Sequence, residues 1–332
     1  MQQQIASLAE IRYHTDTMAQ EHKVKIFSGT SHQELARAIA KHLRLPLSKV
    51  HFSRFASNEI YVRPEKSVRN CDVYIIQTAT SAVNEELMEL FIMLDSFKRS
   101  FAHKVHVVMP YYPYARQDRV AEPREPISAK LVADLISKAG ADHVITVMLH
   151  SDQEQGFFDF PVDNLQTRKM FVDYFKKKKL KNVTVVAPDV GSAKAARRLA
   201  SSLGAELAIL NKERASHNKS QALELVGSVK GRTCILYDDL VDTAGSVCNA
   251  KAVLVAEGAN KEMYLAATHP VLSGGAVTRL RKAHFKEMIF TDSIPIPKAK
   301  HLGNMKILSI APLLAKIIHN VHAGKPLTPI HT

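Results

Sequence analysis

The chain has 332 residues, of which 46% are hydrophobic and 23% are charged. This length and apolar content predict a folded protein of about two domains and exclude a wholly disordered chain, which would be poorer in apolar residues. The 45 basic residues exceed the 32 acidic residues, and the net charge of +13 suits either nucleic acid or a small polyanionic substrate in a basic cleft. Charge alone does not decide between these two partners.

The cysteine content and the pattern of apolar residues indicate which cellular compartment to expect. The three cysteines, Cys71, Cys234 and Cys248, are too few and too scattered for a disulfide framework or a cysteine-rich zinc module, and a reducing cytoplasm is expected. The apolar runs are shorter than the roughly 20 residues that span a bilayer. Residues 1–23 contain no apolar core of the kind found in secretory signals, so 1–22 is interpreted as an N-terminal extension.

Short apolar runs alternate along the chain with amphipathic segments. The expected strands are 24–27, 73–77, 105–109, 144–147, 183–187, 207–210, 234–237, 263–267, 288–290 and 307–310. The expected helices, in which apolar residues recur at three- and four-residue spacing, are 33–43, 84–97, 127–138, 193–203 and 247–257. This alternation predicts an α/β fold of parallel sheets flanked by helices.

A turn-rich, aperiodic stretch at 156–164 divides the chain into two halves with the same order of elements. The expected segments are the extension 1–22, an N-terminal domain 23–165, a C-terminal domain 166–302, and a C-terminal segment 303–332 that packs on the N-terminal domain. Ligands of parallel α/β sheets bind past the carboxyl ends of the strands, so functional residues are expected directly after the apolar runs.

The strongest functional signal is the segment YDDLVDTAGS at 237–246, between an expected strand and an expected helix. The backbone N–H groups of 242–246 can surround a phosphate, with the helix dipole behind them and with hydroxyl groups from Thr243 and Ser246. Asp238 and Asp239 would repel a phosphate but suit sugar hydroxyls, or Mg²⁺ through water. The segment predicts a sugar-phosphate site, and an ordinary acidic N-capped turn is the alternative.

This loop resembles the 5-phosphoribosyl-diphosphate loop shared by phosphoribosyltransferases and ribose-phosphate diphosphokinases. Other motifs resemble the second family, in the same order: YARQDR at 114–119, LH at 149–150, QGFF at 155–158, PVDN at 161–164, PDVG at 188–191, ATHP at 267–270, SG at 273–274 and DSIP at 292–295. The resemblance runs from about residue 24 to about residue 322. The chain is therefore identified as a member of the ribose-phosphate diphosphokinase (PRPP synthase) family.

The resemblance implies two phosphoribosyltransferase-like domains, each a mostly parallel sheet flanked by helices. It implies Mg²⁺-dependent transfer of the diphosphoryl group of ATP to the 1-hydroxyl of ribose 5-phosphate, which gives 5-phosphoribosyl 1-diphosphate and AMP. It also implies a cytoplasmic homo-oligomer, a dimer or a hexamer, that has neither nucleic acid nor a membrane as partner. A phosphoribosyltransferase that consumes the product and a non-catalytic regulatory paralogue of the same fold are the alternatives.

The resemblance assigns ATP to segments of the N-terminal half. The residues implied to contact ATP are Phe55, Ser57, Asn58, Glu59, Arg116 and Gln117. Phe55 would stack on the purine, and a guanidinium such as that of Arg116 can form paired hydrogen bonds with phosphate oxygens. Without the resemblance, Phe55 would be interpreted as a core residue and the RQDR tetrapeptide as a surface ion pair.

The resemblance also implies that His150 and Asp189 share a Mg²⁺ ion. Asp189 follows an expected strand and precedes an expected helix, which is the usual setting of an anion site. Many family members have an aspartate two residues before the histidine, where this chain has Met148, and a thioether does not hold Mg²⁺. If that carboxylate matters, a weaker affinity for the metal is expected here.

The residues implied to bind ribose 5-phosphate are Arg214, Asp238, Asp239, Asp242, Thr243, Ala244, Gly245 and Ser246. Lys212 and Arg214 precede a polar stretch, 215–221, that lacks apolar periodicity and is expected to be mobile. Because phosphoryl transfer has a charge-rich transition state, Lys212 is expected to be catalytic, with Arg214 as its partner near the sugar phosphate. A solvated basic loop is the alternative.

A regulatory difference is also expected near the C-terminus. Many family members bind phosphate or ADP through a hydroxyl-rich loop that matches 309–312 here. Ala311 and Pro312 supply no side-chain donor, and Pro312 also lacks a backbone N–H. Weak or altered activation by phosphate is therefore expected.

Overall fold

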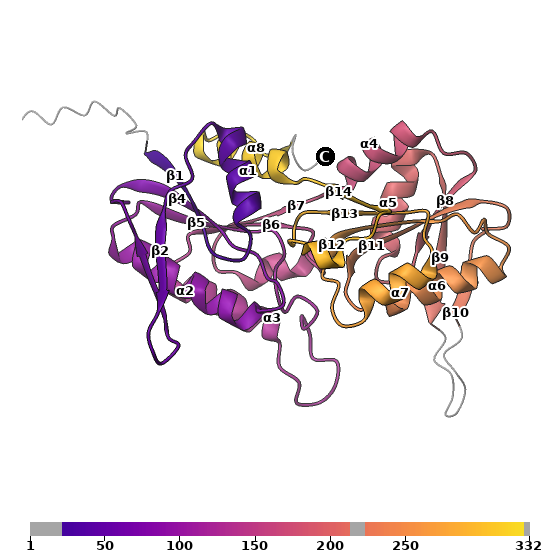
Figure 1. Cartoon of the computed structure of the whole chain (residues 1–332), viewed down its shortest axis with the longest axis horizontal. Helices are drawn as coiled ribbons and strands as arrows, with labels where there is room; N and C mark the ends of the chain where they lie inside the picture. Colours follow the sequence, from indigo (N-terminus) through magenta and orange to yellow (C-terminus); the bar gives the residue numbers. More distant parts are fainter. Residues whose placement is uncertain (1–21, 213–222, 329–332) are drawn as a thin grey trace, which may run out of the picture.

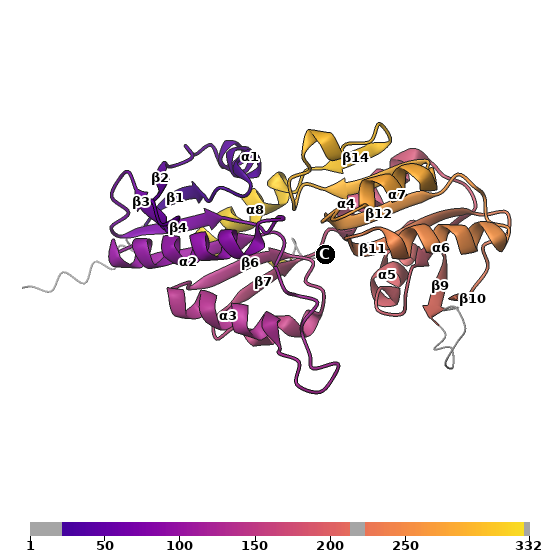
Figure 2. The same cartoon turned by 60° about the horizontal axis from the view of Figure 1, so that its bottom comes forward.

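The computed structural model describes residues 22–212 and 223–328. The expectations for Arg214 and for the loop 215–221 therefore lie outside the described residues, as does nearly all of the extension 1–22. Two large and mostly parallel sheets, one from each half, form the centre of the described chain and lie side by side (Figures 1 and 2). The α/β fold with helix-flanked parallel sheets that the sequence predicts is confirmed.

The first sheet is parallel throughout and is covered by helices on both faces. Its strands, in spatial order, are β1 (Lys23–Ser28), β4 (Cys71–Ile76), β5 (Lys104–Met109), β6 (His143–Val147) and β7 (Val162–Leu165). One face packs on α2 (Val83–Arg99) and α3 (Ser128–Ala139), and the other on α1 (Gln33–Leu43) and α8 (Ala311–His322). This double burial explains why the strands are almost continuously apolar.

The second sheet has seven strands, of which only β10 runs antiparallel to its neighbour. In spatial order they are β10 (Leu223–Val226), β9 (Glu206–Lys212), β8 (Val183–Ala187), β11 (Thr233–Val241), β12 (Tyr264–Pro270), β13 (Glu287–Thr291) and β14 (Met305–Leu308). One face packs on α4 (Arg168–Lys178) and α5 (Ala193–Leu203), and the other on α6 (Gly245–Ala256) and α7 (Ala276–Ala283).

The last part of the chain joins both sheets. β14 is an edge strand of the second sheet, whereas α8 packs beside α1 on the first sheet (Figure 1). Both elements belong to the segment 303–332, for which only packing on the N-terminal domain was expected. The chain therefore crosses between the sheets twice, once after Leu165 and once after Leu308.

Three of the differences from the predicted boundaries have a clear structural cause. β11 continues through Asp238 and Asp239 to Val241, because its backbone pairs with β12 along this stretch and the pairing overrides the polar side chains. β7 pairs with β6, so the predicted break at 156–164 runs into a strand of the first sheet, and the chain leaves that sheet only after Leu165. The predicted strand 307–310 ends at Leu308, because Ile310 is the N-cap of α8.

Several short elements were not predicted. The hairpin of β2 (Val50–Arg54) and β3 (Ile60–Pro64) stands apart from the two large sheets, and two 3₁₀ turns lie at η1 (Asp152–Phe157) and η2 (Lys298–Lys300). Such elements are too short to carry a clear periodicity. Within the described ranges, no helix is both long and apolar enough to cross a membrane.

Candidate functional site

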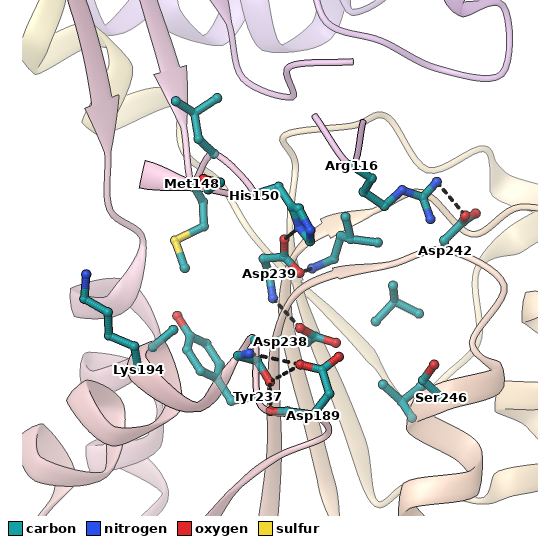
Figure 3. Close-up of a pocket in the computed structure, with 18 of the residues that line it drawn as sticks. Arg116, Met148, His150, Asp189, Lys194, Tyr237, Asp238, Asp239, Asp242 and Ser246 are labelled. Atoms are coloured by element: carbon teal, nitrogen blue, oxygen red, sulfur yellow. Dashed lines mark hydrogen bonds and ion pairs between the residues drawn. The ribbon is translucent and has the colours of Figure 1, made fainter. Parts of the chain in front are cut away.

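A cavity of about 820 Å³ lies where the carboxyl ends of strands from both sheets meet. The first sheet contributes residues after β6 and the loop after β5. The second sheet contributes the loop after β8 and the end of β11 with the loop that follows it. Figure 3 shows these side chains pointing toward one another, with dashed lines between residues of different segments.

The loop 242–246 forms one wall of the cavity and leads directly into α6. Ala244 is the N-cap of α6, has a left-handed φ of 62°, and makes no side-chain capping bond. The first backbone N–H groups of the helix therefore remain available to an anion, which the helix dipole also favours. The guanidinium of Arg279 donates to the carbonyl oxygen of Thr243 at 2.8 Å, and the Ser273 hydroxyl donates to Asp242.

Two polar contacts join the two sheets across the cavity. His150 Nδ1 lies 2.6 Å from Asp239 Oδ2, and Arg116 Nη2 lies 2.9 Å from Asp242 Oδ2. The hydrogen bond with Asp239 raises the pKa of His150 in spite of partial burial. Burial opposes ionisation of Asp239, but the hydrogen bond and the charge of His150 outweigh it and lower the pKa of Asp239. Both shifts favour an ion pair.

In the part of the chain that the structure describes, the neighbouring carboxylate of Asp238 has no cationic partner of this kind. Burial, together with the negative charges of Asp239 and Asp189, raises the pKa of Asp238 well above its usual range. Asp189 turns back on its own loop, where Oδ1 accepts a hydrogen bond from the backbone N–H of Ser192 at 3.0 Å. A cation in this part of the cavity would relieve the repulsion between the carboxylates.

The carboxylates of the cavity suit a Mg²⁺ ion that has only a few protein ligands. Carboxylate oxygens and water are its preferred ligands, and Mg²⁺ at phosphate sites uses one or two carboxylates and completes its shell with water and substrate. Among the described residues, no three His, Cys, Asp or Glu side chains are grouped so as to hold a metal ion by themselves. The cavity therefore suits a Mg²⁺ ion that arrives with a phosphate substrate.

Most of the residues predicted to form a site line this one cavity. They are Arg116, His150, Asp189, Asp238, Asp239, Asp242, Thr243, Ala244, Gly245 and Ser246. Met148, where family members often carry an aspartate, lines it as well. Lys212 is the last residue of β9, and its predicted partner Arg214 lies outside the described residues.

The predicted adenine residues lie elsewhere, on the turn between β2 and β3. The side chain of Phe55 is 58% exposed and meets Tyr61 edge-on, so the alternative that Phe55 is a core residue is wrong. Ser57 donates to Glu59 at 2.6 Å, and Asn58 adopts a left-handed φ of 70° at the turn.

Gln117 also points away from the cavity. Its side-chain oxygen accepts a hydrogen bond from the hydroxyl of Ser128 at 2.6 Å, at the start of α3. This leaves Arg116 as the member of the predicted ATP set that lines the cavity wall within the described chain.

Several cavity residues were given no role from the sequence. They include Asp118, Arg119, Asp152, Arg168, Lys194 and Arg198. Lys194 in the first turn of α5 pairs with Asp152 of η1 at 3.2 Å, which is another contact between the two halves. Only their position in the sequence could have identified them. Lys194 and Arg168, for example, each lie in the first turn of a helix that follows a buried strand.

Comparison with known proteins agrees with these features. Residues 24–140 match the family model described as the N-terminal domain of ribose phosphate pyrophosphokinase, and residues 213–330 match the phosphoribosyl synthetase-associated domain. A ribose-phosphate pyrophosphokinase of Oceanobacillus iheyensis is 47% identical over 299 residues, which cover 90% of this chain and 94% of the relative. One from Clostridium perfringens is 46% identical and covers 92% and 96%.

A solved structure agrees equally well. The crystal structure of phosphoribosylpyrophosphate synthetase from Mycobacterium smegmatis matches with a TM-score of 0.87 and 42% identity, over 91% of this chain and 99% of that one. Both halves of the described fold are thus of the phosphoribosyltransferase-like kind found in that enzyme. On these grounds the chain belongs to the ribose-phosphate pyrophosphokinase (PRPP synthase) family of enzymes.

Proposed function

We propose that the chain transfers the diphosphoryl group of ATP to ribose 5-phosphate in the cavity between its two sheets. The observation that carries this proposal is the pair of contacts across the cavity, His150 with Asp239 and Arg116 with Asp242. Each contact joins a residue assigned to ATP or its metal with a residue assigned to the sugar phosphate. Two substrates bound to these residues would therefore be neighbours.

Ribose 5-phosphate binds along the end of β11 and the loop after it. The 5-phosphate is received by the N–H groups of 242–246 and by the hydroxyls of Thr243 and Ser246, at the positive end of α6. The carboxylates of Asp238 and Asp239 accept hydrogen bonds from the ribose hydroxyls. The charges orient the sugar, because the N–H groups of 242–246 attract its phosphate and the carboxylates of Asp238 and Asp239 repel it.

The phosphates of ATP bind on the opposite wall. Arg116 forms hydrogen bonds with phosphate oxygens once it exchanges its present partner Asp242 for the nucleotide. His150 and Asp189 hold the Mg²⁺ ion, which neutralises phosphate charge when it is bound. Asp239 keeps the imidazole of His150 in place through Nδ1.

The 1-hydroxyl then attacks the β-phosphorus in line, and AMP leaves. Lys212 and Arg214 stabilise the charge that develops on the transferred group and on the leaving oxygen. The adenine is recognised outside the cavity, by Phe55, Ser57, Asn58, Glu59 and Gln117. The enzyme acts as a cytoplasmic homo-oligomer, a dimer or a hexamer, without nucleic acid or membrane as partner.

The test is to incubate the purified protein with ATP, ribose 5-phosphate and Mg²⁺ and to separate the nucleotides by chromatography. AMP and 5-phosphoribosyl 1-diphosphate should form in equal amounts, and only when both substrates are present. Release of diphosphate that depends on a nucleobase would instead indicate a phosphoribosyltransferase. Calorimetric binding of Mg-ATP without any AMP would indicate a regulatory paralogue.

A further inference from the structure

His269 is a buried histidine that belongs to no substrate subsite yet lies at the junction of the two sheets. It is 2% exposed and sits near the end of β12 in the second sheet. Nε2 lies 3.1 Å from the carbonyl oxygen of Met148 in the first sheet, and Nδ1 lies 2.9 Å from Ser293 Oγ. The ring also packs against Tyr111, with 5.0 Å between centroids.

The partners of His269 determine its tautomer. A carbonyl oxygen can only accept, so Nε2 carries the proton and donates it to Met148. Burial lowers the pKa of His269, which favours the neutral ring, and in a neutral ring Nδ1 must then accept. Ser293 Oγ lies within hydrogen-bond distance of both Nδ1 (2.9 Å) and Thr268 O (3.0 Å). Its single proton goes to Nδ1 when the ring is neutral, because Thr268 O also accepts from the Thr291 hydroxyl at 2.7 Å. The buried ring is thus held at both nitrogens by fixed partners.

Met148 occupies a turn that would not form without support. Its φ of 52° lies in the left-handed region, which an unbranched apolar side chain seldom adopts. Three hydrogen bonds hold this turn. Met148 N–H donates to Leu165 O at 2.9 Å, Leu149 N–H donates to Asn164 Oδ1 at 3.1 Å, and Met148 O accepts from His269.

The turn determines where His150 points. It lies two residues after Met148 and reaches Asp239 of β11, with 2.6 Å between Nδ1 and Oδ2. In the register of the second sheet, Leu240 of β11 is paired with His269 of β12. The residue that holds the turn and the residue that His150 contacts are therefore fixed on adjacent strands, one position apart.

We propose that His269 is a positioning residue. It ties the Met148–His150 turn of the first sheet to the strand pair of the second sheet, and so sets the imidazole of His150 against Asp239. The inference rests on the proposed role of His150 in this cavity. Through this tie, the relative placement of the two sheets affects the ATP side of the site. The loop 242–246 is not affected.

Two variants of His269 separate positioning from packing. The amide nitrogen of glutamine lies at the place of Nε2, whereas that of asparagine lies at the place of Nδ1. His269→Asn should therefore lower kcat by about 10- to 100-fold, since a misplacement of about 1 Å costs that much, with the KM for ribose 5-phosphate within about twofold of wild type. His269→Gln should recover most of the loss.

Thr167→Val is the matched control. Thr167, the N-cap of α4, shares a buried hydrogen bond of 2.8 Å with Thr268, the neighbour of His269 on β12. The valine variant therefore removes a buried hydrogen bond beside His269 without touching the Met148 turn. Its kcat should stay within about twofold of wild type. Equal losses in His269→Gln, His269→Asn and Thr167→Val would show a purely structural role and overturn the proposal.

A spectroscopic measurement on the intact wild-type protein does not depend on activity. In protein labelled with ¹⁵N-histidine, the signal that disappears in His269→Gln should be that of a neutral Nε2–H tautomer at neutral pH. An Nδ1–H tautomer would overturn the proposal even if both His269 variants are inactive. Absence of AMP from the wild type would instead reject the proposed function, so the two failures are distinguishable.

Discussion

Arg116 and Asp242 form an ion pair with 2.9 Å between Nη2 and Oδ2, although the arginine follows β5 of the first sheet and the aspartate follows β11 of the second. The arginine is half exposed and the aspartate is largely covered, so the arginine is the partner that can move away. In the proposed function, each of the two side chains occupies the position that a substrate would take beside the other. The pair marks the point where the proposed ATP and sugar-phosphate subsites meet.

Asp242→Asn should therefore weaken the sugar-phosphate site. The amide keeps the size of the side chain and one acceptor, but it removes the charge that strengthens the hydrogen bond from the Ser273 hydroxyl, which holds the start of the phosphate loop 242–246 in place. Loss of a charge-assisted hydrogen bond costs about 1.5–3 kcal/mol, so the KM for ribose 5-phosphate should rise about 10- to 100-fold. Asp95→Asn, which breaks an exposed pair with Arg99, is the control. An unchanged KM in the Asp242 variant would contradict this role.

Lys212→Ala should keep the fold but nearly abolish turnover. Removal of one cation that stabilises a phosphoryl-transfer transition state costs about 10³-fold or more in kcat. The measurement is the rate of AMP formation at saturating substrates, together with the thermal unfolding midpoint. Lys286→Ala removes a lysine that pairs with Glu262 on the surface, and it should leave kcat unchanged. If Lys212→Ala turns over like the wild type, the catalytic assignment is wrong.

Met148→Asp should strengthen metal binding. The side chain at 148 lines the cavity, and an aspartate tolerates the left-handed φ of 52° better than a methionine does. The added carboxylate is a preferred Mg²⁺ ligand, so the Mg²⁺ concentration for half-maximal activity should fall several-fold. Met148→Asn matches the backbone preference without the charge and should show no such fall. The same fall in both variants would rule out a metal effect.

Loss of the proton on Glu154 should lower the free energy of unfolding as the pH rises. Burial raises its pKa from the ordinary value of 4.5 to about 7, so the folded state holds a proton that the unfolded chain releases. The stability that this proton provides is complete below about pH 4.5 and is lost progressively up to about pH 7, a change of the order of 2 kcal/mol.

Glu154→Gln tests this linkage, because glutamine keeps the acceptor for the backbone N–H of Ser151. With EDTA present and no substrates, its unfolding midpoint relative to wild type should be several degrees higher at pH 8 than at pH 5. An equal difference at both values would show that Glu154 has an ordinary pKa in the folded protein.

Inorganic phosphate should activate the enzyme weakly. The backbone N–H of Ile310, where phosphate would meet the start of α8, already donates to Asp292 Oδ1 at 2.7 Å, and Ala311 N–H donates to the Ser309 hydroxyl. The carboxylate of Asp292 would also repel an anion. Activity titrated with phosphate at constant ionic strength should change by less than about twofold. A steep phosphate requirement would contradict this expectation.

The regular elements could be predicted because their burial is simple. The helices at 33–43 and 193–203 and the strand at 183–187 have the predicted bounds, since an apolar stripe and a doubly buried strand each leave a plain pattern. The hairpin of β2 and β3 escaped detection because its residues are half exposed. β11 was predicted too short because its pairing with β12 is not visible in local sequence.

The site was predictable loop by loop but not as a constellation. The residues that follow β6, β8 and β11 line one cavity, which is where the rule that ligands bind at the carboxyl ends of parallel strands predicts a site. The contacts between these residues could not be predicted. The pair His150 and Asp239 and the pair His269 and Met148 each join residues far apart in the chain. Such contacts depend on how two sheets meet, which no local pattern encodes.

The most direct test of the proposed site is a crystal structure with Mg²⁺, ribose 5-phosphate and an ATP analogue that has a methylene group between its α- and β-phosphorus atoms. The account predicts the 5-phosphate against the N–H groups of 242–246, the ribose hydroxyls toward Asp238 and Asp239, and the triphosphate beside Arg116. A sugar phosphate bound elsewhere, with the loop 242–246 turned out of the cavity, would contradict it.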